Sequence, residues 1–280
     1  MVRIADAVEE CRRILSGSTD DAGFEVSVLA QEVLEMDRLK LRVHCDDEIS
    51  NEQYTSLISF AKRRAGGEPS AYIIGHREFM SLDFEVNPDV LIPRPDTEIL
   101  VEEVIGKYAG SKVRVLDICT GSGAIACSLA HYMNEAVVVG LDISNAALEV
   151  ASSNARRTST SDRVSFLCAD ALNMPGSLGE FDVVVSNPPY IETATITSLS
   201  RTVRDFEPML ALDGGADGLT FYKKIVSDID RFLKKGGELY FEIGYNQADA
   251  VCEIMREKFS GINVIKDLAG NNRVVCGQLV

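Results

Sequence analysis

Residues 98–280 contain the feature that most constrains the fold, a repeated alternation of helical segments with short apolar runs. The runs are continuously apolar, which is typical of strands covered on both faces. The alternation therefore predicts an α/β fold, with a doubly wound, mostly parallel seven-stranded sheet. We predict strands at 113–118, 136–141, 164–168, 181–185, 238–243, 263–267 and 273–279, and helices at 124–132, 145–156, 219–233 and 248–258.

The last two predicted strands are joined only by a turn at Gly270-Asn271-Asn272. Parallel strands need a connection of about a dozen residues or more. We therefore expect the chain to end in an antiparallel hairpin.

The first 75 residues carry apolar side chains at helical spacing. One stripe in residues 4–15 stops at Ser16-Gly17, and a second covers residues 26–34. Ser50 with Gln53 three residues later is a capping box that opens a third helix, which ends at Gly66-Gly67. Several short amphipathic helices predict a small bundle.

Between these two regions the apolar period changes to two, which predicts a β-hairpin. We therefore divide the chain into a helical bundle at 1–75, a hairpin linker at 76–92 and an α/β domain at 93–280. The bundle contains no residue pattern that indicates catalysis.

Composition excludes several classes of protein. The 43 acidic and 28 basic residues give a net charge of −15, which disfavours a binder of duplex DNA or anionic membranes. Seven scattered cysteines without a Cys-x-x-Cys pair indicate reduced thiols, and the three histidines have no metal-ligand spacing. No apolar run reaches the length of a membrane span and the start has no apolar signal core, so we expect a cytoplasmic protein without a metal.

A glycine loop follows the first predicted strand of the α/β domain, in the stretch Asp117 to Gly123. Glycines let the backbone approach a ligand, and the start of the next helix offers unpaired N–H groups. Gly121-x-Gly123-x-x-Ala126 also fits the dinucleotide fingerprint. The candidate cofactor residues here are Cys119, Thr120, Gly121, Ser122 and Gly123.

Two acids follow the next two predicted strands. Asp142 is placed to accept hydrogen bonds from both ribose hydroxyls, although it could instead cap the helix after Ser144. Asp170 is suited to the amine of adenine, although it could also be a solvated loop acid. The loop and the two acids predict an adenosine-type cofactor, without deciding between NAD and S-adenosylmethionine.

Asn187-Pro188-Pro189-Tyr190 follows the fourth strand, at the sheet edge where ligands bind in such folds. Two prolines remove N–H donors, keep carbonyl acceptors and stiffen the turn. The amide oxygen of Asn187, the carbonyl of Pro188 and the ring of Tyr190 then form an acceptor pair beside a flat wall. We call Asn187 to Tyr190 the acceptor turn. This arrangement is suited to a planar NH2 group, so these four residues are our candidate catalytic and substrate-binding residues.

A conjugated NH2 group is a poor nucleophile because its lone pair is delocalised. Two acceptors on its hydrogens would hold it in place and favour electron density on nitrogen during attack. Aligned with a sulfonium methyl, it needs only in-line displacement, to which positioning can contribute about 7–11 kcal/mol. No strong general base is required, because the alkylated amide loses its proton readily to water.

These motifs together resemble the peptide chain release factor N(5)-glutamine methyltransferases, the PrmC/HemK family. The resemblance covers nearly the whole chain. It lies in Tyr72-Ile73-x-Gly75, Leu91 to Glu98, Asp117 to Gly123, Ser186 to Ile191, Glu207-Pro208, Asp217-Gly218-Leu219, Glu242-Ile243-Gly244 and Asp267-x-x-Gly270-x-x-Arg273-Val274.

The resemblance implies a class I methyltransferase fold and S-adenosyl-L-methionine-dependent methylation of the glutamine in the Gly-Gly-Gln loop of bacterial-type release factors. It implies that the glycine loop, Asp142, Asp170-Ala171 and Asn187 hold the cofactor. Arg94, Pro95, Thr97 and Glu98 would close over its methionine end, although they could instead be a structural elbow between domains. The bundle would help to dock the release factor, and we expect a monomer without nucleic-acid or membrane contacts.

One departure from the family pattern concerns the glycine loop. Cys119 stands where the family often has its first glycine, so a side chain there could crowd the cofactor.

Several other functions remain open at this point. An exocyclic-amine DNA methyltransferase would use the same acceptor turn, but it must also bind the phosphates of DNA, which the net charge of −15 disfavours. A glutamine methyltransferase acting on a ribosomal protein would differ only in the helical bundle at 1–75. The acceptor turn disfavours a dinucleotide oxidoreductase and a non-catalytic adenosine-binding module.

Overall fold

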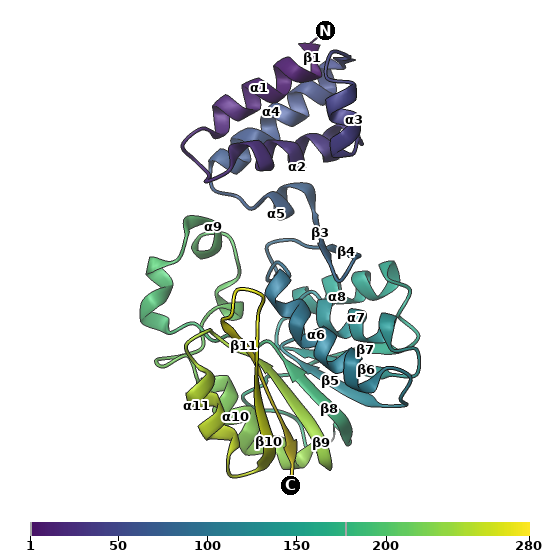
Figure 1. Cartoon of the computed structure of the whole chain (residues 1–280), viewed down its shortest axis with the longest axis vertical. Coiled ribbons are helices and arrows are strands. Elements are labelled where there is room, and N and C mark those ends of the chain that lie inside the picture. The colour runs from purple at the N-terminus through teal and green to yellow at the C-terminus, as the bar shows by residue number, and fades with distance from the viewer. Residues whose placement is uncertain (1, 177) are drawn as a thin grey trace. The chain divides into compact units, whose positions relative to one another are not determined.

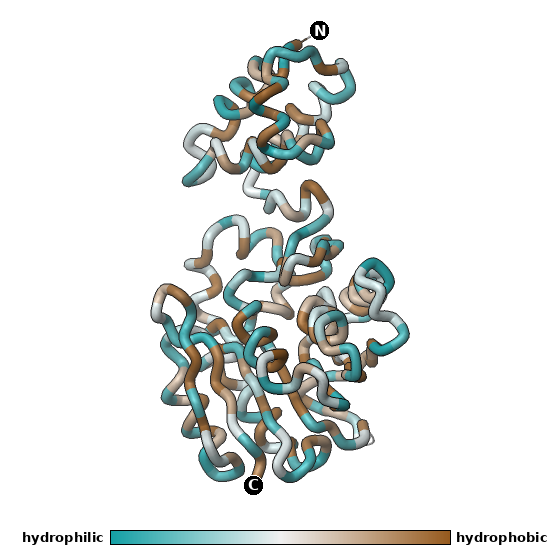
Figure 2. Tube along the Cα trace, turned by 45° about the vertical axis from the view of Figure 1, so that its right-hand side comes forward, coloured by the Kyte–Doolittle hydropathy of each residue, from teal (hydrophilic) through white to brown (hydrophobic). Residues whose placement is uncertain are grey.

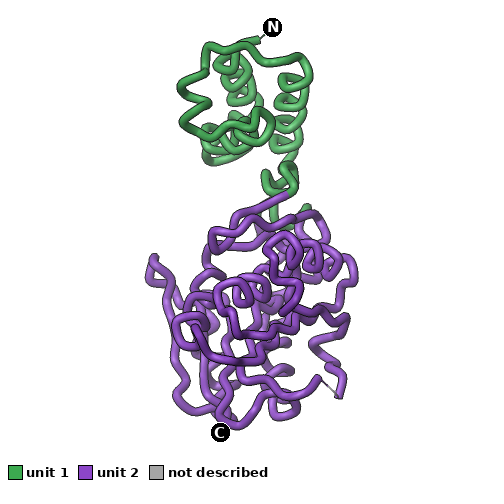
Figure 3. The backbone as a smooth tube through the Cα atoms, turned by 90° about the vertical axis from the view of Figure 1, so that its right-hand side faces the viewer, with its two compact units in different colours: residues 1–75, 200–206 green, residues 76–199, 207–280 purple. Residues whose placement is uncertain are grey.

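The computed structural model describes residues 2–176 and 178–280, which divide into two compact units (Figure 3). One unit contains the residues up to Gly75 together with Ser200–Phe206, and the other contains His76–Leu199 and Glu207–Val280. Residues 76–92 thus belong to the second unit, because Phe79 and Phe84 are buried in its core.

The first unit is helical. The predicted capping box of Ser50 and Gln53 is confirmed at the start of the third long helix. The unit comprises β1 (Val2–Arg3), α1 (Ile4–Leu15), α2 (Ala22–Leu34), α3 (Arg38–Val43), β2 (Glu48–Ile49), α4 (Asn51–Ala65), α5 (Ser70–Ile74) and α9 (Arg201–Arg204). The apolar stripe of α1 faces α2 and α4, where Cys11, Leu29 and Leu57 are fully buried.

The second unit is built on a seven-stranded sheet with the order β10-β11-β9-β8-β5-β6-β7. β5 to β8 and β9 pair in parallel, whereas β10 and β11 form the predicted antiparallel hairpin. The α/β fold class is therefore confirmed. The strands are β5 (Arg114–Ile118), β6 (Val137–Asp142), β7 (Val164–Cys168), β8 (Phe181–Ser186), β9 (Leu233–Glu242), β10 (Phe259–Lys266) and β11 (Asn272–Leu279).

Helices cover both faces of this sheet (Figure 1). One apolar layer joins the sheet to α6 (Pro95–Tyr108), α7 (Ala124–Tyr132) and α8 (Asn145–Arg157). The other joins it to α10 (Thr220–Asp228) and α11 (Ala248–Met255). Apolar segments run along the strands between the layers (Figure 2), as expected for strands that are shielded from water on both sides.

A separate hairpin of β3 (His76–Phe79) and β4 (Leu82–Glu85) precedes the sheet. Met80 and Ser81 at its turn have φ values of 50° and 57°. This left-handed geometry suits a two-residue hairpin turn.

The predicted helix at 219–233 is too long. α10 ends at Asp228, a 3-10 turn η3 (Ile229–Arg231) follows, and Leu233 already begins β9. Leu233 pairs with Phe181 across the sheet, so its apolar side chain fills the core from a strand rather than from a helix. The short helices η1 (Thr193–Ser198) and η2 (Met209–Ala211) were not predicted.

No helix in the described part of the chain combines the length and the apolar composition that crossing a membrane requires.

Candidate active site

The carboxyl ends of four parallel strands bring the predicted site residues to one edge of the sheet. Cys119 follows β5, Asp142 ends β6, Asp170 follows β7 and Asn187 follows β8. β5 is hydrogen-bonded to β6 on one side and to β8 on the other, so the chain order reverses at this strand. Open α/β sheets bind their ligands at such a switch point.

The backbone of the glycine loop is hydrogen-bonded to the end of β6. The Gly121 N–H donates to Asp142 Oδ2 over 2.9 Å, and the Thr120 N–H donates to the Leu141 carbonyl over 2.9 Å. Gly121 has a φ of 53°, and a Cβ built on it would meet no described atom within 4 Å. The loop therefore leaves open space beside its own backbone, as a bound ligand requires.

Gly123 differs from Gly121 because neighbouring residues pack closely against its Cα. A Cβ here would lie 3.0 Å from Ala151 Cβ and 3.2 Å from the Phe166 ring. Ser122 is buried, and its carbonyl accepts a hydrogen bond from the side chain of Asn154. This end of the loop is therefore fixed by packing against α8 and β7.

Asp142 is the carboxylate that organises the loop. Besides Gly121, it accepts the Ser144 N–H on Oδ1 over 3.0 Å, and burial raises its pKa. The helix cap is Ser144 itself, whose hydroxyl accepts from the Ala147 N–H. Each carboxylate oxygen has a second lone pair, so Asp142 keeps acceptor capacity for two hydroxyl donors.

Asp170 and Ala171 lie on the other side of β6. Asp170 is half-buried and accepts the Leu172 N–H on Oδ1 over 2.8 Å. Ala171 is 4% exposed and packs in the same apolar cluster as Leu141. Asp170 is thus held in place by the backbone at its own turn.

Cys119 is the residue that departs from the family pattern. Its φ of 63° is left-handed, a conformation that favours glycine over residues with a side chain. Burial, followed by the nearby carboxylates Asp142 and Asp117, raises the pKa of its thiol well above the ordinary value. This shift favours the neutral thiol over the nucleophilic thiolate at Cys119.

Asp117 at the end of β5 was not predicted as a site residue, although it begins the loop motif. It is fully buried, and burial raises its pKa to about 7 against the opposing hydrogen bond from the Thr120 hydroxyl. This pairing fixes the Thr120 side chain beneath the loop.

The acceptor turn is braced by residues 207–218, which we call the strap. The Ile191 N–H donates to the Leu212 carbonyl, and the Gly214 N–H donates back to the Ile191 carbonyl over 2.8 Å. The side chain of Gln247 donates to the Tyr190 carbonyl over 3.0 Å. Pro188 and Pro189 are buried, so the turn is rigid for reasons of both sequence and packing.

Asn187 is half-buried at the start of this turn, and its Nδ2 donates to Thr97 Oγ1 over 3.3 Å. Thr97 is in the first turn of α6 and is 5% exposed. The two residues are 90 positions apart in sequence, and the structure brings them together.

The rest of the Arg94 to Glu98 group makes structural contacts. Arg94 forms an ion pair with Glu207 of the strap, and Pro95 begins α6. Glu98 accepts the Met80 N–H over 2.6 Å at the turn of the β3–β4 hairpin. These contacts of Arg94 and Glu98 lie within the second unit, whereas Thr97 faces the acceptor turn.

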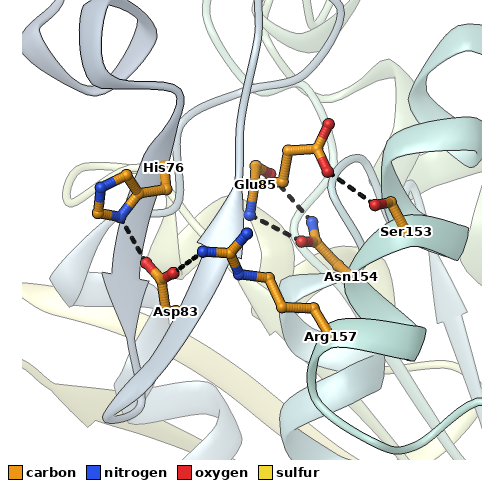
Figure 4. A network of polar contacts seen from close by, with 6 residues as sticks. All are labelled: His76, Asp83, Glu85, Ser153, Asn154 and Arg157. Carbon is orange, nitrogen blue, oxygen red and sulfur yellow. Dashed lines mark hydrogen bonds and ion pairs between the residues drawn. The ribbon is translucent and has the colours of Figure 1, made fainter.

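A polar network attaches the hairpin to α8 (Figure 4), and one further bond of Asn154 reaches the glycine loop. Asn154 of α8 accepts the Glu85 N–H and donates to both the Glu85 and Ser122 carbonyls. Asp83 contacts both His76 and Arg157. Because Asn154 is fully buried, the network couples the position of the hairpin to that of the glycine loop.

Buried charged residues that sequence reasoning did not single out surround the acceptor turn. Glu207 is 5% and Glu242 is 2% exposed, and Oε2 of each lacks a hydrogen-bond partner in the described structure. Arg273 contacts Asp96 at the start of α6 over 3.0 Å. The only signal for these residues was their place in family motifs. Within residues 2–176 and 178–280, no three His, Cys, Asp or Glu side chains are grouped as metal ligands.

Two family models match separate parts of the chain. Residues 109–278 match the family model described as Methyltransferase domain. Residues 6–75 match the model described as PrmC N-terminal domain. The first match alone covers more than half of the chain.

Curated relatives align over nearly the full length. A release factor glutamine methyltransferase of Clostridium acetobutylicum is 41% identical over 278 residues, covering 98% of each chain. One of Moorella thermoacetica is 41% identical over 268 residues, covering 95% of this chain and 94% of the relative.

Among solved structures, a methyltransferase from Pyrococcus furiosus has a TM-score of 0.54 at 20% identity. The match covers 71% of this chain and 90% of that chain. It shows that the two proteins share a fold.

Proposed function

This chain belongs to the family of release factor glutamine methyltransferases, and from that premise we propose its cofactor, its target motif and the roles of its site residues. The family membership confirms the resemblance predicted from the motifs, and the chain is a glutamine methyltransferase. We propose that it uses S-adenosyl-L-methionine to methylate the amide nitrogen of the glutamine in the Gly-Gly-Gln loop of bacterial-type release factors. The observation that carries this proposal is the acceptor turn at the edge of the sheet, next to the glycine loop.

The residues at the edge fit the proposed cofactor. The open space beside Gly121 would admit it, and the glycine loop from Cys119 to Gly123 would contact it through the backbone. Asp142 would accept from the ribose hydroxyls, and Asp170 with Ala171 would face the adenine. When bound, S-adenosylmethionine supplies an electrophilic methyl group on a sulfonium sulfur.

The acceptor turn would hold the substrate amide. The Asn187 side-chain oxygen and the Pro188 carbonyl would accept its two hydrogens, and Tyr190 would line one face. Burial raises the pKa of Tyr190, so its hydroxyl stays neutral and does not serve as a base. The turn therefore acts by orientation and by matching acceptors to the charge that develops on the N–H groups.

We further propose that the enzyme acts in the cytoplasm as a monomer, without direct contacts to nucleic acid or membrane. The net charge of −15 supports the absence of nucleic-acid and membrane contacts, because binding to a nucleic-acid backbone or an anionic membrane is favoured by a positive field. The helical bundle at 1–75 would help to dock the release factor, and residues 93–280 would carry the methyl transfer.

Mass spectrometry of candidate substrates tests the proposed function. The enzyme is incubated with methyl-labelled cofactor and a release factor, a ribosomal protein or an adenine-containing DNA duplex. We expect one methyl group on the glutamine of Gly-Gly-Gln in the release factor. Labelling of the ribosomal protein or of DNA alone would contradict the proposed target.

Asp142→Ala tests the cofactor site. We expect S-adenosylhomocysteine to bind about ten- to 100-fold more weakly, because a carboxylate that accepts two hydroxyl donors is lost. Isothermal titration calorimetry measures the dissociation constant of S-adenosylhomocysteine, and NAD is titrated separately as the alternative ligand. Ser144→Ala is the matched control, since it removes only a helix cap. An unchanged dissociation constant in Asp142→Ala would reject the ribose role.

A further inference from the structure

Large apolar side chains that are more than half exposed lie on segments next to the acceptor turn. We call them the apolar rim, which consists of Met209, Leu210, Tyr245 and Leu268. They come from the strap, from the loop after β9 and from the turn between β10 and β11. Single exposed apolar side chains are ordinary, whereas several of them around one site indicate an interaction surface.

The strap holds its part of the rim close to the acceptor turn. Met209 and Leu210 lie in η2, and the Met209 carbonyl accepts the Leu212 N–H over 3.0 Å. The Leu212 carbonyl in turn accepts the Ile191 N–H over 3.0 Å. Because Ile191 directly follows Tyr190, η2 is joined to the acceptor turn by two successive backbone hydrogen bonds.

Tyr245 is held near the acceptor turn by the side chain of Gln247. β9 lies beside β8 and runs parallel to it, so the loop after β9 is at the same edge of the sheet as the acceptor turn. Gln247 Nε2 donates to the Tyr190 carbonyl over 3.0 Å, and its Oε1 accepts the Gly244 N–H over 2.9 Å. This one side chain therefore connects the backbone next to Tyr245 with the acceptor turn.

Leu268 is fully exposed on the turn between β10 and β11. Asp267 fixes this turn, because its Oδ1 accepts two backbone N–H groups of the turn over 3.0 and 2.8 Å. The side chain of Asn272 donates to the Tyr245 carbonyl over 3.4 Å, which joins the turn to the loop after β9. A fully exposed leucine adds no buried area to this fold, so a fixed turn that presents it suits contact with another molecule.

Charged side chains near the rim are paired within the chain. Arg273 contacts Asp267 over 3.1 Å and Asp96 over 3.0 Å. Arg94 forms its ion pair with Glu207 at the start of the strap. A partner that binds through phosphates would find these arginines already engaged by carboxylates, so the rim suits an apolar protein surface.

We propose that the apolar rim is the docking surface for the part of the release factor that flanks the target glutamine, and that this part presents apolar side chains. The inference rests on the proposed function of the acceptor turn. A glutamine side chain is short, so the backbone that carries it must come close to the acceptor turn. The neighbours of that glutamine then lie over the rim, and the burial of apolar surface stabilises the complex.

Leu268→Ser and Tyr245→Ser test the docking surface by calorimetry, with enzyme that is saturated with S-adenosylhomocysteine. Each substitution should raise the Kd of the release factor about tenfold, as truncation of an apolar interface residue does. The KM for the release factor should rise with it, whereas kcat at saturating release factor and the affinity for S-adenosylhomocysteine should stay unchanged. The thermal midpoint should also stay unchanged, because both side chains are exposed.

Val137→Thr is the matched control. Val137 is another exposed large apolar residue, but it begins β6 and so lies at the opposite edge of the sheet. This variant should bind the release factor with the wild-type Kd.

Cross-linking identifies what covers the rim. A photoreactive amino acid placed at position 268 should cross-link to the release factor within a few residues of the target glutamine, and the same group at position 137 should not. Cross-links to a remote part of the release factor, or between two copies of the enzyme, would contradict the proposed occupant.

The binding data decide between failure of the docking surface and failure of the proposed function. An enzyme that methylates the glutamine, but whose Leu268→Ser and Tyr245→Ser variants keep Kd within twofold of the wild type, would reject the docking surface alone. A wild-type enzyme that binds and cross-links the release factor through the rim without methylating its glutamine would instead reject the proposed function.

Discussion

Replacing Asn187 by alanine is expected to lower turnover about 10²–10³-fold, as removal of one preorganised hydrogen-bond partner of a transition state does. The side chain supplies one of the two acceptors of the turn, and its loss leaves the substrate amide free to rotate. Cofactor affinity should change less, because the glycine loop and Asp142 remain. Single-turnover kinetics with saturating cofactor measure the effect.

The exposed Asn134 provides the control for this experiment, since Asn134→Ala removes the same group far from the sheet edge. It should retain wild-type turnover. Near-normal turnover in Asn187→Ala would count strongly against the acceptor mechanism. A large loss of cofactor affinity with unchanged turnover would instead restrict Asn187 to the cofactor site.

Gly214→Ala is expected to lower turnover about 10²-fold, although this substitution changes none of the proposed catalytic residues. A Cβ at this position would lie 2.7 Å from Tyr190 Cα and 2.8 Å from the Pro189 carbonyl oxygen. Both contacts are with backbone, so the strap and the acceptor turn must shift apart. A displacement of about 1 Å at a positioned amide can cost about 10²-fold in rate. The kcat at saturating cofactor, with the thermal midpoint as a check on folding, measures this.

Gly106→Ala is the matched glycine control. Gly106 lies within α6, and a Cβ there would meet no described atom within 4 Å apart from its own helix. Because alanine is the better helix former, this variant should be slightly more stable and equally active. Equal turnover in Gly214→Ala and in the wild type would show that the strap does not set the position of the turn.

The sequence predicted the sheet and the edge at which the site lies. Continuous apolar runs and glycine or proline punctuation are local signals, and they were sufficient for β5 to β8. Parallel strands joined by helices place their carboxyl ends together, so the glycine loop, Asp142 and Asn187 had to converge. The sequence was less informative where a helix gives way to a strand without such a signal, as at Leu233.

Only the tertiary structure decided which side chains meet at that edge. Asn187 bonds to Thr97 across 90 residues, and Arg94 pairs with Glu207 across 113. The close approach of Gly214 to Tyr190 and the burial of Glu242 also depend on how separate segments pack. The physical reason is that hydrophobic periodicity records which face of an element is buried, whereas a contact between remote polar groups depends on the order and register of the strands that carry them.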